Sequence, residues 1–192
     1  PRAAFTQVTG RLRKVLTVPL ITSNRINMPD VAEAVLARGD ADLVSMARPM
    51  LADPELVRKA FEGREDEINT CIACNQACLD HTFGDYKQVS CLVNPRACRE
   101  TLLNYEKTAQ PKRLAVVGAG PAGLAYATVA AQRGHKVTLF DSASEIGGQF
   151  NLAKRIPGKE EFYETLRYYQ RMIAKHGVVL RLNTRVDAAL LA

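Results

Sequence analysis

A glycine-rich turn between an expected strand and an expected helix constrains the second half of this 192-residue chain more than any other feature. Residues 114–117 are apolar and predict a strand, and residues 118–123 follow with the sequence GAGPAG. Gly118 permits the tight turn, Gly120 permits close approach of a pyrophosphate, and Gly123 permits close packing of helix on strand. The helix that follows would present amide donors to phosphate groups.

An acidic residue stands where such a fold needs one. A second strand is predicted over residues 136–140, and Asp141 follows it directly. An acid at this place binds the adenosine ribose in dinucleotide-binding folds. An amphipathic helix over about 162–173 and a strand over 178–182 continue the alternation. The pattern predicts a Rossmann-like nucleotide-binding domain, and the structural alternative is an ordinary glycine turn between packed elements.

All five cysteines lie between residues 71 and 98, in a segment with little periodicity. The first four have the spacing C-x2-C-x3-C-x12-C, and they are Cys71, Cys74, Cys78 and Cys91. Four thiolates in a short loop suit a tetrahedral metal ion or an iron–sulfur cluster. Zinc sites more often show two C-x2-C pairs, and the second pair is missing here. We therefore expect a 4Fe-4S cluster, with a zinc site or metal-free thiols as alternatives.

Three further residues of this segment have expected roles. Cys98 lies beyond the fourth ligand and is expected to be a buried free thiol. Asn75 and Gln76 lie inside the ligand loop, where they could donate to cluster sulfurs or act as spacers. Disulfides are disfavoured because a nucleotide-binding enzyme without a secretion signal is expected in the cytoplasm, where thiols stay reduced.

Residues 1–63 alternate between expected helices and strands. Strands are predicted over 18–21 and 42–46, a helix from about Pro29, and a further helix capped by Asp53. Short connections between alternating elements indicate parallel strands covered by helices. Two such units cannot close a core alone, so they predict the end of a TIM (β/α)8 barrel or of an open sheet.

An arginine follows each of these two strands, namely Arg25 and Arg48. The loops after the last two strands of a TIM barrel commonly bind phosphate. Arginine suits that role because its planar fork binds phosphate oxygens in pairs. The alternative is a pair of surface arginines in ion pairs.

Composition limits the remaining possibilities. The net charge of +6 is spread along the chain, and basic and aromatic residues do not interleave, so nucleic-acid binding is not expected. No apolar stretch is long enough to predict a membrane span. The first residue is not Met and the last residues complete no element, so we expect a piece of a longer protein.

The order of these parts resembles the multi-domain relatives of old yellow enzyme, and among them most closely the bacterial NADPH-dependent 2,4-dienoyl-CoA reductases. The likeness rests on residues 22–27 (TSNRIN), 45–49 (SMARP), 69–78 (NTCIACNQAC), 90–98 (SCLVNPRAC) and 116–123 (VVGAGPAG). The glycine pair in residues 145–150 (EIGGQF) and the stretch 156–160 (IPGKE) extend it. The glycine pair also resembles the FAD-binding domains of glutathione-reductase-like flavoproteins, which favours FAD over NAD at the glycine-rich turn.

The resemblance implies cofactor roles by position. It implies FMN contacts from Arg25, Ala47 and Arg48, and cluster ligands from the four cysteines of the C-x2-C-x3-C-x12-C stretch. It implies FAD contacts from Ala122, Asp141, Gln149 and Lys159, beside Gly118, Gly120 and Gly123. In the family, NADPH reduces FAD, single electrons cross a 4Fe-4S cluster to FMN, and reduced FMN delivers hydride to a dienoyl-CoA thioester.

The resemblance also implies a domain plan. Residues 1–69 would be the end of an FMN-binding TIM barrel, 70–111 an iron–sulfur segment with a linker, and 112–192 the start of the FAD/NAD(P)-binding domain. The proton-donating tyrosine and histidine of the family would precede Pro1, so no catalytic residue is expected in this chain, and the chain alone is expected to be inactive. The alternatives are an enoate reductase or a trimethylamine dehydrogenase-like enzyme of the same architecture, or a non-catalytic zinc-binding interaction module.

Overall fold

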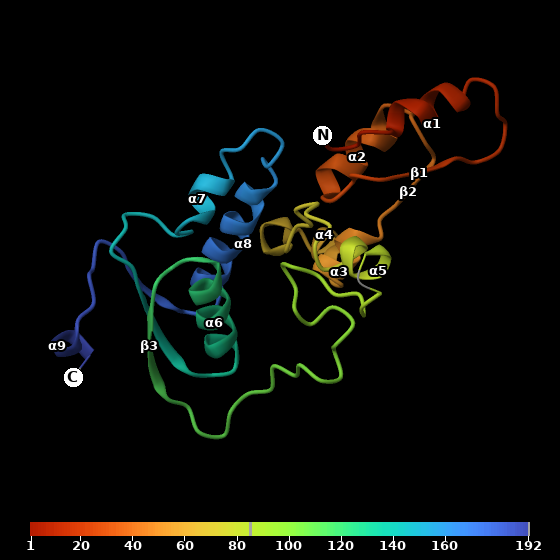
Figure 1. Cartoon of the computed structure of the whole chain (residues 1–192). Helices are drawn as coiled ribbons and strands as arrows, with labels where there is room; N and C mark the ends of the chain where they lie inside the picture. Colours follow the sequence, from red (N-terminus) through yellow and green to blue (C-terminus); the bar gives the residue numbers. More distant parts are fainter. Residues whose placement is uncertain (85, 192) are drawn as a thin grey trace. The chain divides into compact units, whose positions relative to one another are not determined.

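The computed structural model describes residues 1–84 and 86–191, and the chain divides into two units, Pro1–Glu100 and Thr101–Ala192. Figure 1 labels the helices and strands of both units.

In its described residues, 1–84 and 86–100, the first unit contains a pair of strands, five α-helices and one 3-10 helix. In chain order they are α1 (Thr6–Leu12), β1 (Ile21–Ser23), α2 (Pro29–Ala37), β2 (Leu43–Ser45), α3 (Arg48–Ala52), α4 (Leu56–Phe61), η1 (Glu65–Glu67) and α5 (Leu79–Phe83). Between α5 and the second unit the described residues form turns and irregular backbone.

Strands β1 and β2 are parallel, and their register pairs Ile21 with Leu43 and Ser23 with Ser45. Helix α2 connects them, with Pro29 at its first position, where the missing N–H costs no helical hydrogen bond. The strand–helix–strand unit therefore has the parallel arrangement that the sequence predicts. Its small core is formed under the strand ends by Ile26, Ala32 and Val35.

Two local expectations in this unit are wrong. The first strand begins at Ile21 rather than residue 18, because Pro19 has no backbone N–H to give to a ladder. Asp53 does not occupy the N-cap position, which falls at Glu55 because the helix begins only at Leu56. Oδ1 of Asp53 nevertheless accepts a 3.0 Å bond from the Glu55 amide, while Oδ2 of this buried side chain accepts a 2.6 Å bond from Nζ of Lys59.

The second unit contains a three-stranded parallel sheet in the order β3–β4–β5. Its elements are β3 (Arg113–Val117), α6 (Pro121–Gln132), β4 (Lys136–Phe140), α7 (Phe150–Ala153), α8 (Phe162–Lys175), β5 (Val179–Arg181) and α9 (Ala188–Leu191). The three strands and two long helices lie within a few residues of the predicted ranges. This agreement follows from the regular spacing of apolar residues in these segments.

Helices α6 and α8 pack against each other and, with the sheet, enclose the core of the second unit. Leu124 of α6 and Leu139 of β4 are completely buried in it, and Leu166 and Ile173 contribute from α8. The register pairs Val117 with Phe140, so β3 and β4 end together. The predicted glycine-rich turn and the predicted acid therefore leave the sheet side by side.

Among the residues that the structure describes, no helix has the length and apolar character needed to cross a membrane.

Candidate functional site

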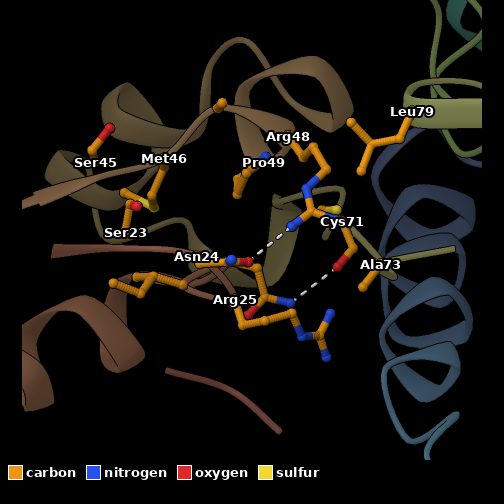
Figure 2. Close-up of a pocket in the computed structure, with 13 residues that line it drawn as sticks. Ser23, Asn24, Arg25, Ser45, Met46, Arg48, Pro49, Cys71, Ala73 and Leu79 are labelled. Carbon is orange, nitrogen blue, oxygen red and sulfur yellow. Dashed lines mark hydrogen bonds between the residues drawn. The ribbon is translucent and has the colours of Figure 1, made fainter. Parts of the chain in front are cut away.

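The carboxyl ends of β1 and β2 open onto one pocket of about 300 Å³. Because Ser23 pairs with Ser45, the loops that follow the two strands leave the sheet next to each other. Three residues that the sequence singles out for FMN, Arg25, Ala47 and Arg48, all line this pocket (Figure 2). The size lies at the lower end of the range for small-molecule sites.

The guanidinium of Arg48 lies between two asparagine side chains. Its Nη1 donates a 2.6 Å hydrogen bond to Oδ1 of Asn75, and its Nη2 donates a 3.1 Å bond to Oδ1 of Asn24. Figure 2 shows Arg48 reaching toward Asn24, with the guanidinium of Arg25 lying apart from it. A guanidinium has more N–H donors than these two bonds use, so Arg48 retains donors for a phosphate oxygen.

The backbone of the β1 loop is strained at the pocket. Asn24 and Arg25 have φ of 79° and 58°, which places two consecutive non-glycine residues in the left-handed region. Such residues cost free energy and concentrate at binding sites, where the surrounding structure holds them. The backbone carbonyl of Arg25 accepts a 2.8 Å hydrogen bond from the Ala3 amide, which ties this loop to the N-terminal segment.

Four cysteines from two separate stretches surround one small, mostly apolar cavity. They are the residues with the C-x2-C-x3-C-x12-C spacing, Cys71, Cys74, Cys78 and Cys91. All four are half-buried free thiols. Within residues 1–84 and 86–191, no three His, Cys, Asp or Glu side chains form a set that fits a single metal ion.

Burial raises the pKa of two of these thiols. Loss of water disfavours the thiolate, so the pKa of Cys91 rises to about 11 and that of Cys71 rises above its usual value. Backbone N–H groups oppose the rise at both residues, and the positive charge of Arg48 also opposes it at Cys71. Bound metal would supply the positive charge that thiolates need in this cavity.

A network of side-chain hydrogen bonds holds the two cysteine stretches together. The Asn69 amide N–H donates to Oδ2 of Asp53 at 2.8 Å, and Nδ2 of Asn69 donates to the carbonyl of Val93 at 2.7 Å. Nδ2 of Asn94 donates to the carbonyl of Leu51 at 2.8 Å. The stretch before Cys71 and the stretch after Cys91 are thereby fixed to each other and to α3.

The structure corrects one expectation about this segment and refines another. Cys98 is exposed rather than buried, and its φ is 61°. Oδ1 of Asn75, one of two residues considered as donors to cluster sulfurs, accepts from Arg48, a contact that uses the oxygen of this side chain and not its Nδ2 donor. Gln76 is exposed. The sequence missed Asn27, which lines the pocket and whose Nδ2 donates a 3.0 Å bond to the carbonyl of Cys71.

In the second unit the glycine-rich turn has the close packing that its sequence predicts. A Cβ at Gly123 would lie 1.8 Å from the carbonyl oxygen of Gly118, so only glycine fits. Gly118 itself has a φ of 103°. Gly120 precedes the first residue of α6, and Ala122 lies in the first turn, where helical N–H groups have no helical partner.

The carboxylate of Asp141 accepts a hydrogen bond from the backbone of the glycine-rich turn. Oδ2 accepts a 2.6 Å hydrogen bond from the Ala119 amide, and Oδ1 accepts a 2.8 Å bond from the Ala143 amide. The acid therefore lies where β4 ends, beside the turn, as a ribose-binding acid does. Each carboxylate oxygen can accept more than one bond, so these contacts leave capacity for hydroxyl donors.

The second glycine pair packs on the first turn. The Gly147 amide donates a 2.7 Å bond to the carbonyl of Ala119, and a Cβ at Gly148 would lie 3.2 Å from Cα of Gly120. Gln149 follows immediately at the start of α7 and is exposed, as is Lys159, whose Nζ lies 5.5 Å from the centre of the Phe162 ring. Gln149 thus lies in the segment that adjoins the turn.

Comparison with known proteins agrees with this division. Residues 2–67 match the family model of the NADH:flavin oxidoreductase / NADH oxidase family, and residues 116–177 match that of an NAD(P)-binding Rossmann-like domain. A "metal reductase" of Desulforamulus reducens is 44% identical over 96% of this chain, and an "NADH oxidase" of Thermoanaerobacter brockii is 38% identical over 94%. The chain spans 28% of the length of each of these relatives.

Two solved structures are similar over nearly the whole chain. A complex of 2-naphthoyl-CoA reductase is 39% identical with a TM-score of 0.92, and covers 98% of this chain with 29% of its own. Histamine dehydrogenase from Rhizobium sp. 4-9 is 28% identical with a TM-score of 0.90, and covers 99% of this chain with 28% of its own. Residues 2–67 are therefore similar to the NADH:flavin oxidoreductase / NADH oxidase family, and residues 116–177 are similar to an NAD(P)-binding Rossmann-like domain.

Proposed function

We propose that the holoprotein containing this chain is an iron–sulfur flavoprotein oxidoreductase that passes electrons from NADPH to a CoA thioester. The observation that carries the proposal is the adjacency of two sites in the first unit. The pocket that contains the proposed FMN residues and the cavity that contains four cysteines are lined in part by the same residues, Arg48, Cys71 and Ala73. Electron transfer between two redox groups needs such proximity.

The residues of the pocket suit a flavin phosphate. In the proposed complex, Arg48 and Arg25 bind the phosphate of FMN, and the exposed Ala47 leaves room for it at the start of α3. Asn24 keeps Arg48 oriented through its 3.1 Å hydrogen bond. These residues bind and orient the cofactor, and this chain contributes no proposed catalytic residue.

The cysteines suit a cluster better than a single zinc ion. All four cysteines face one cavity, and their spacing lacks the second C-x2-C pair that zinc sites more often show. In a 4Fe-4S cluster each thiolate binds a different iron, so the ligands need not meet at one point. We assign Cys71, Cys74, Cys78 and Cys91 as its ligands.

The second unit would hold FAD. The proposed contacts are the amides of the glycine-rich turn, from Gly118 to Gly123 with Ala122, the carboxylate of Asp141, and the exposed side chains of Gln149 and Lys159. When bound, the flavins exchange electrons in pairs or singly and the cluster exchanges them singly, which allows a hydride donor to supply a one-electron carrier.

For the substrate we propose a 2,4-dienoyl-CoA thioester, which would place the enzyme in the β-oxidation of unsaturated fatty acids. The similarity to 2-naphthoyl-CoA reductase, named for a CoA thioester, supports this class. A second candidate is oxidation of a methylated amine, favoured by 32% identity to a dimethylamine dehydrogenase of Hyphomicrobium and by the histamine dehydrogenase structure. A third candidate substrate is an enoate, favoured by 34% identity to a cinnamate reductase of Clostridium sporogenes.

The test is composition and turnover of the holoprotein purified without oxygen. We expect about four iron and four sulfide atoms per chain, together with FMN and FAD, and NADPH oxidation that depends on dienoyl-CoA. Cys78→Ser should lose the iron, whereas Cys98→Ser, a matched change at an exposed cysteine, should keep it. Zinc without iron, or absence of flavin, would overturn the proposal. Turnover with methylamines or enoates instead of dienoyl-CoA would overturn only the substrate.

A further inference from the structure

Two hydrogen bonds join the pocket at the strand ends to the cysteine segment. Arg48 donates to Oδ1 of Asn75 at 2.6 Å, and Nδ2 of Asn27 donates to the carbonyl of Cys71 at 3.0 Å. Each bond links parts of the chain that are far apart in sequence: one end lies shortly after a strand, at Asn27 or at the start of α3, and the other lies between residues 71 and 75. The wall of the pocket and the wall of the cysteine cavity are therefore one connected structure.

Asn75 is held in the orientation that this contact requires. Its φ is 62°, a left-handed conformation that asparagine adopts more readily than most residues, and its carbonyl accepts a 3.0 Å bond from the Asp80 amide. It lies between Cys74 and Cys78 in the sequence, so its backbone moves with two of the cavity cysteines. Its side chain reaches out of that loop to Arg48.

Asn75 affects the pocket through the side chain of Arg48, which lines it. The two asparagines accept hydrogen bonds from the guanidinium and belong to separate segments: Asn24 to the loop after β1, and Asn75 to the cysteine segment. Without Asn75, Arg48 would keep only the longer of the two bonds and gain rotamer freedom. A long side chain that is not pre-oriented binds its ligand more weakly because it must be ordered on binding.

We propose that Asn75 is a positioning residue that couples flavin binding in the pocket to the integrity of the cysteine segment, by holding Arg48 toward the flavin phosphate. The inference rests on the proposed function, because it takes FMN as the ligand of the pocket and a cluster as the ligand of the cysteines. Coupling between two sites is reciprocal, so bound FMN should also stabilise the cysteine segment.

The experiment compares three variants of the holoprotein. Asn75→Gly removes the acceptor and tolerates the positive φ, Asn75→Asp retains an acceptor oxygen at the same place, and Gln76→Ala changes the adjacent, exposed amide. FMN affinity is measured by quenching of flavin fluorescence, first with the cluster present and then after its removal with a chelator. The rate of iron release to the chelator is measured with and without FMN.

In the wild type, cluster removal should weaken FMN binding about tenfold, the effect expected for loss of one hydrogen bond to a charged group. Bound FMN should in turn slow iron release. Asn75→Gly should bind FMN about tenfold more weakly even with the cluster present, and cluster removal should then have little further effect. Gln76→Ala should behave like the wild type, and in Asn75→Asp cluster removal should still weaken FMN binding, although the added negative charge lowers the FMN affinity itself.

The inference is overturned if Asn75→Gly binds FMN as tightly as the wild type does. It is also overturned if cluster removal weakens FMN binding in Asn75→Gly as much as in the wild type. Either result leaves the proposed function intact. If Asn75→Gly loses its iron altogether, Asn75→Asp decides, because absence of any effect of cluster removal on FMN binding in this variant, which keeps the acceptor, also overturns it. A holoprotein without FMN or iron would overturn the proposed function and this inference with it.

Discussion

Gly123 in the first turn of α6 lies so close to Gly118 that a Cβ at position 123 would stand 1.8 Å from the Gly118 carbonyl oxygen. The obstacle is backbone at the end of β3, which cannot rotate aside as a side chain can. At Gly120, three residues earlier, a Cβ would meet nothing within 4 Å. Packing therefore requires glycine at position 123, whereas the protein itself leaves room for a Cβ at position 120, where the proposed reason for glycine is access for a dinucleotide.

Gly123→Ala should therefore destabilise the second unit by about 3 kcal/mol or more, since overpacking against rigid backbone forces the helix away from the sheet. Hydrogen–deuterium exchange of the β3 and α6 peptides in urea measures the change. Gly120→Ala is the matched control and should leave the protection of these peptides nearly unchanged while weakening FAD binding. Equal stability of the two variants would contradict the packing argument.

A buried ion pair anchors the first unit, and its loss should be costly. Lys59 and Asp53 side chains are 12% and 4% exposed, and Nζ of Lys59 also donates to the Glu67 carbonyl at 2.9 Å. Lys59→Met would leave the Asp53 carboxylate buried without its partner, at a cost of about 3–5 kcal/mol. Denaturant dependence of exchange in the α4 peptide measures the loss.

The neighbouring residue supplies the control for this prediction. Arg58 pairs with Glu55 on the same helix, and those side chains are 59% and 48% exposed. Arg58→Met should cost less than about 0.5 kcal/mol, because exposed ion pairs contribute little. If both variants lose a similar free energy of unfolding, the loss comes from a changed helix α4 and not from the unpaired buried charge.

Tyr169 should make the stability of the second unit sensitive to alkaline pH. Burial raises its pKa to about 12, with a further contribution from Tyr105, against an ordinary value of 10.0. A raised pKa means that the folded state favours the neutral phenol, so stability is complete below pH 10 and falls as pH rises toward 12. The loss should reach about 2–3 kcal/mol.

The check on Tyr169 is the free energy of unfolding between pH 8 and 12, with Tyr169→Phe for comparison. The difference between wild type and variant should change with pH only above about pH 10. Absorbance at alkaline pH should show one fewer late-titrating phenol in the variant. A difference that is constant from pH 8 to 12 would contradict the burial argument.

In the metal-free protein, the rate of alkylation should distinguish the cavity thiol of Cys91 from the exposed thiol of Cys98. With a pKa of about 11, only about one thousandth of Cys91 is thiolate at pH 8, and the neutral thiol does not react with alkylating agents. Iodoacetamide should therefore modify the exposed Cys98 first, and modification of Cys91 should accelerate as pH rises. Mass spectrometry of the peptides gives both rates, and equal rates at pH 8 would be inconsistent with the burial of Cys91.

The second unit was the more predictable part of the fold because its signals are local. The apolar runs of β3 and β4, the glycine-rich turn between β3 and α6, and the helical spacing of Phe162 and Leu166 each fix an element from neighbouring residues alone. Likewise, Asp141 lies beside the turn because β3 and β4 end in register. Periodicity and turn chemistry therefore sufficed there.

In the first unit the failures come from contacts between residues distant in sequence. The sequence around Asp53 has the form of a helix cap, and Oδ1 accepts from the Glu55 amide, but Oδ2 accepts from Lys59 and from the backbone amide of Asn69, which lies 16 positions away. Similarly, no local pattern could show that Asn75 would accept from Arg48, or that Cys98 would be exposed. Such pairings are set by tertiary packing, which outweighs local preference.

The backbone conformation and hydrogen bond of Asn24, in the loop after β1, limit which residues this position can accept. Position 24 needs a residue that tolerates a φ of 79° and also offers an acceptor 3.1 Å from the Arg48 guanidinium. Glycine meets the first demand and glutamine the second, but among common residues only asparagine and aspartate meet both. Evolutionary drift at this site should thus be confined to those two residues in any descendant that keeps Arg48 in its present orientation.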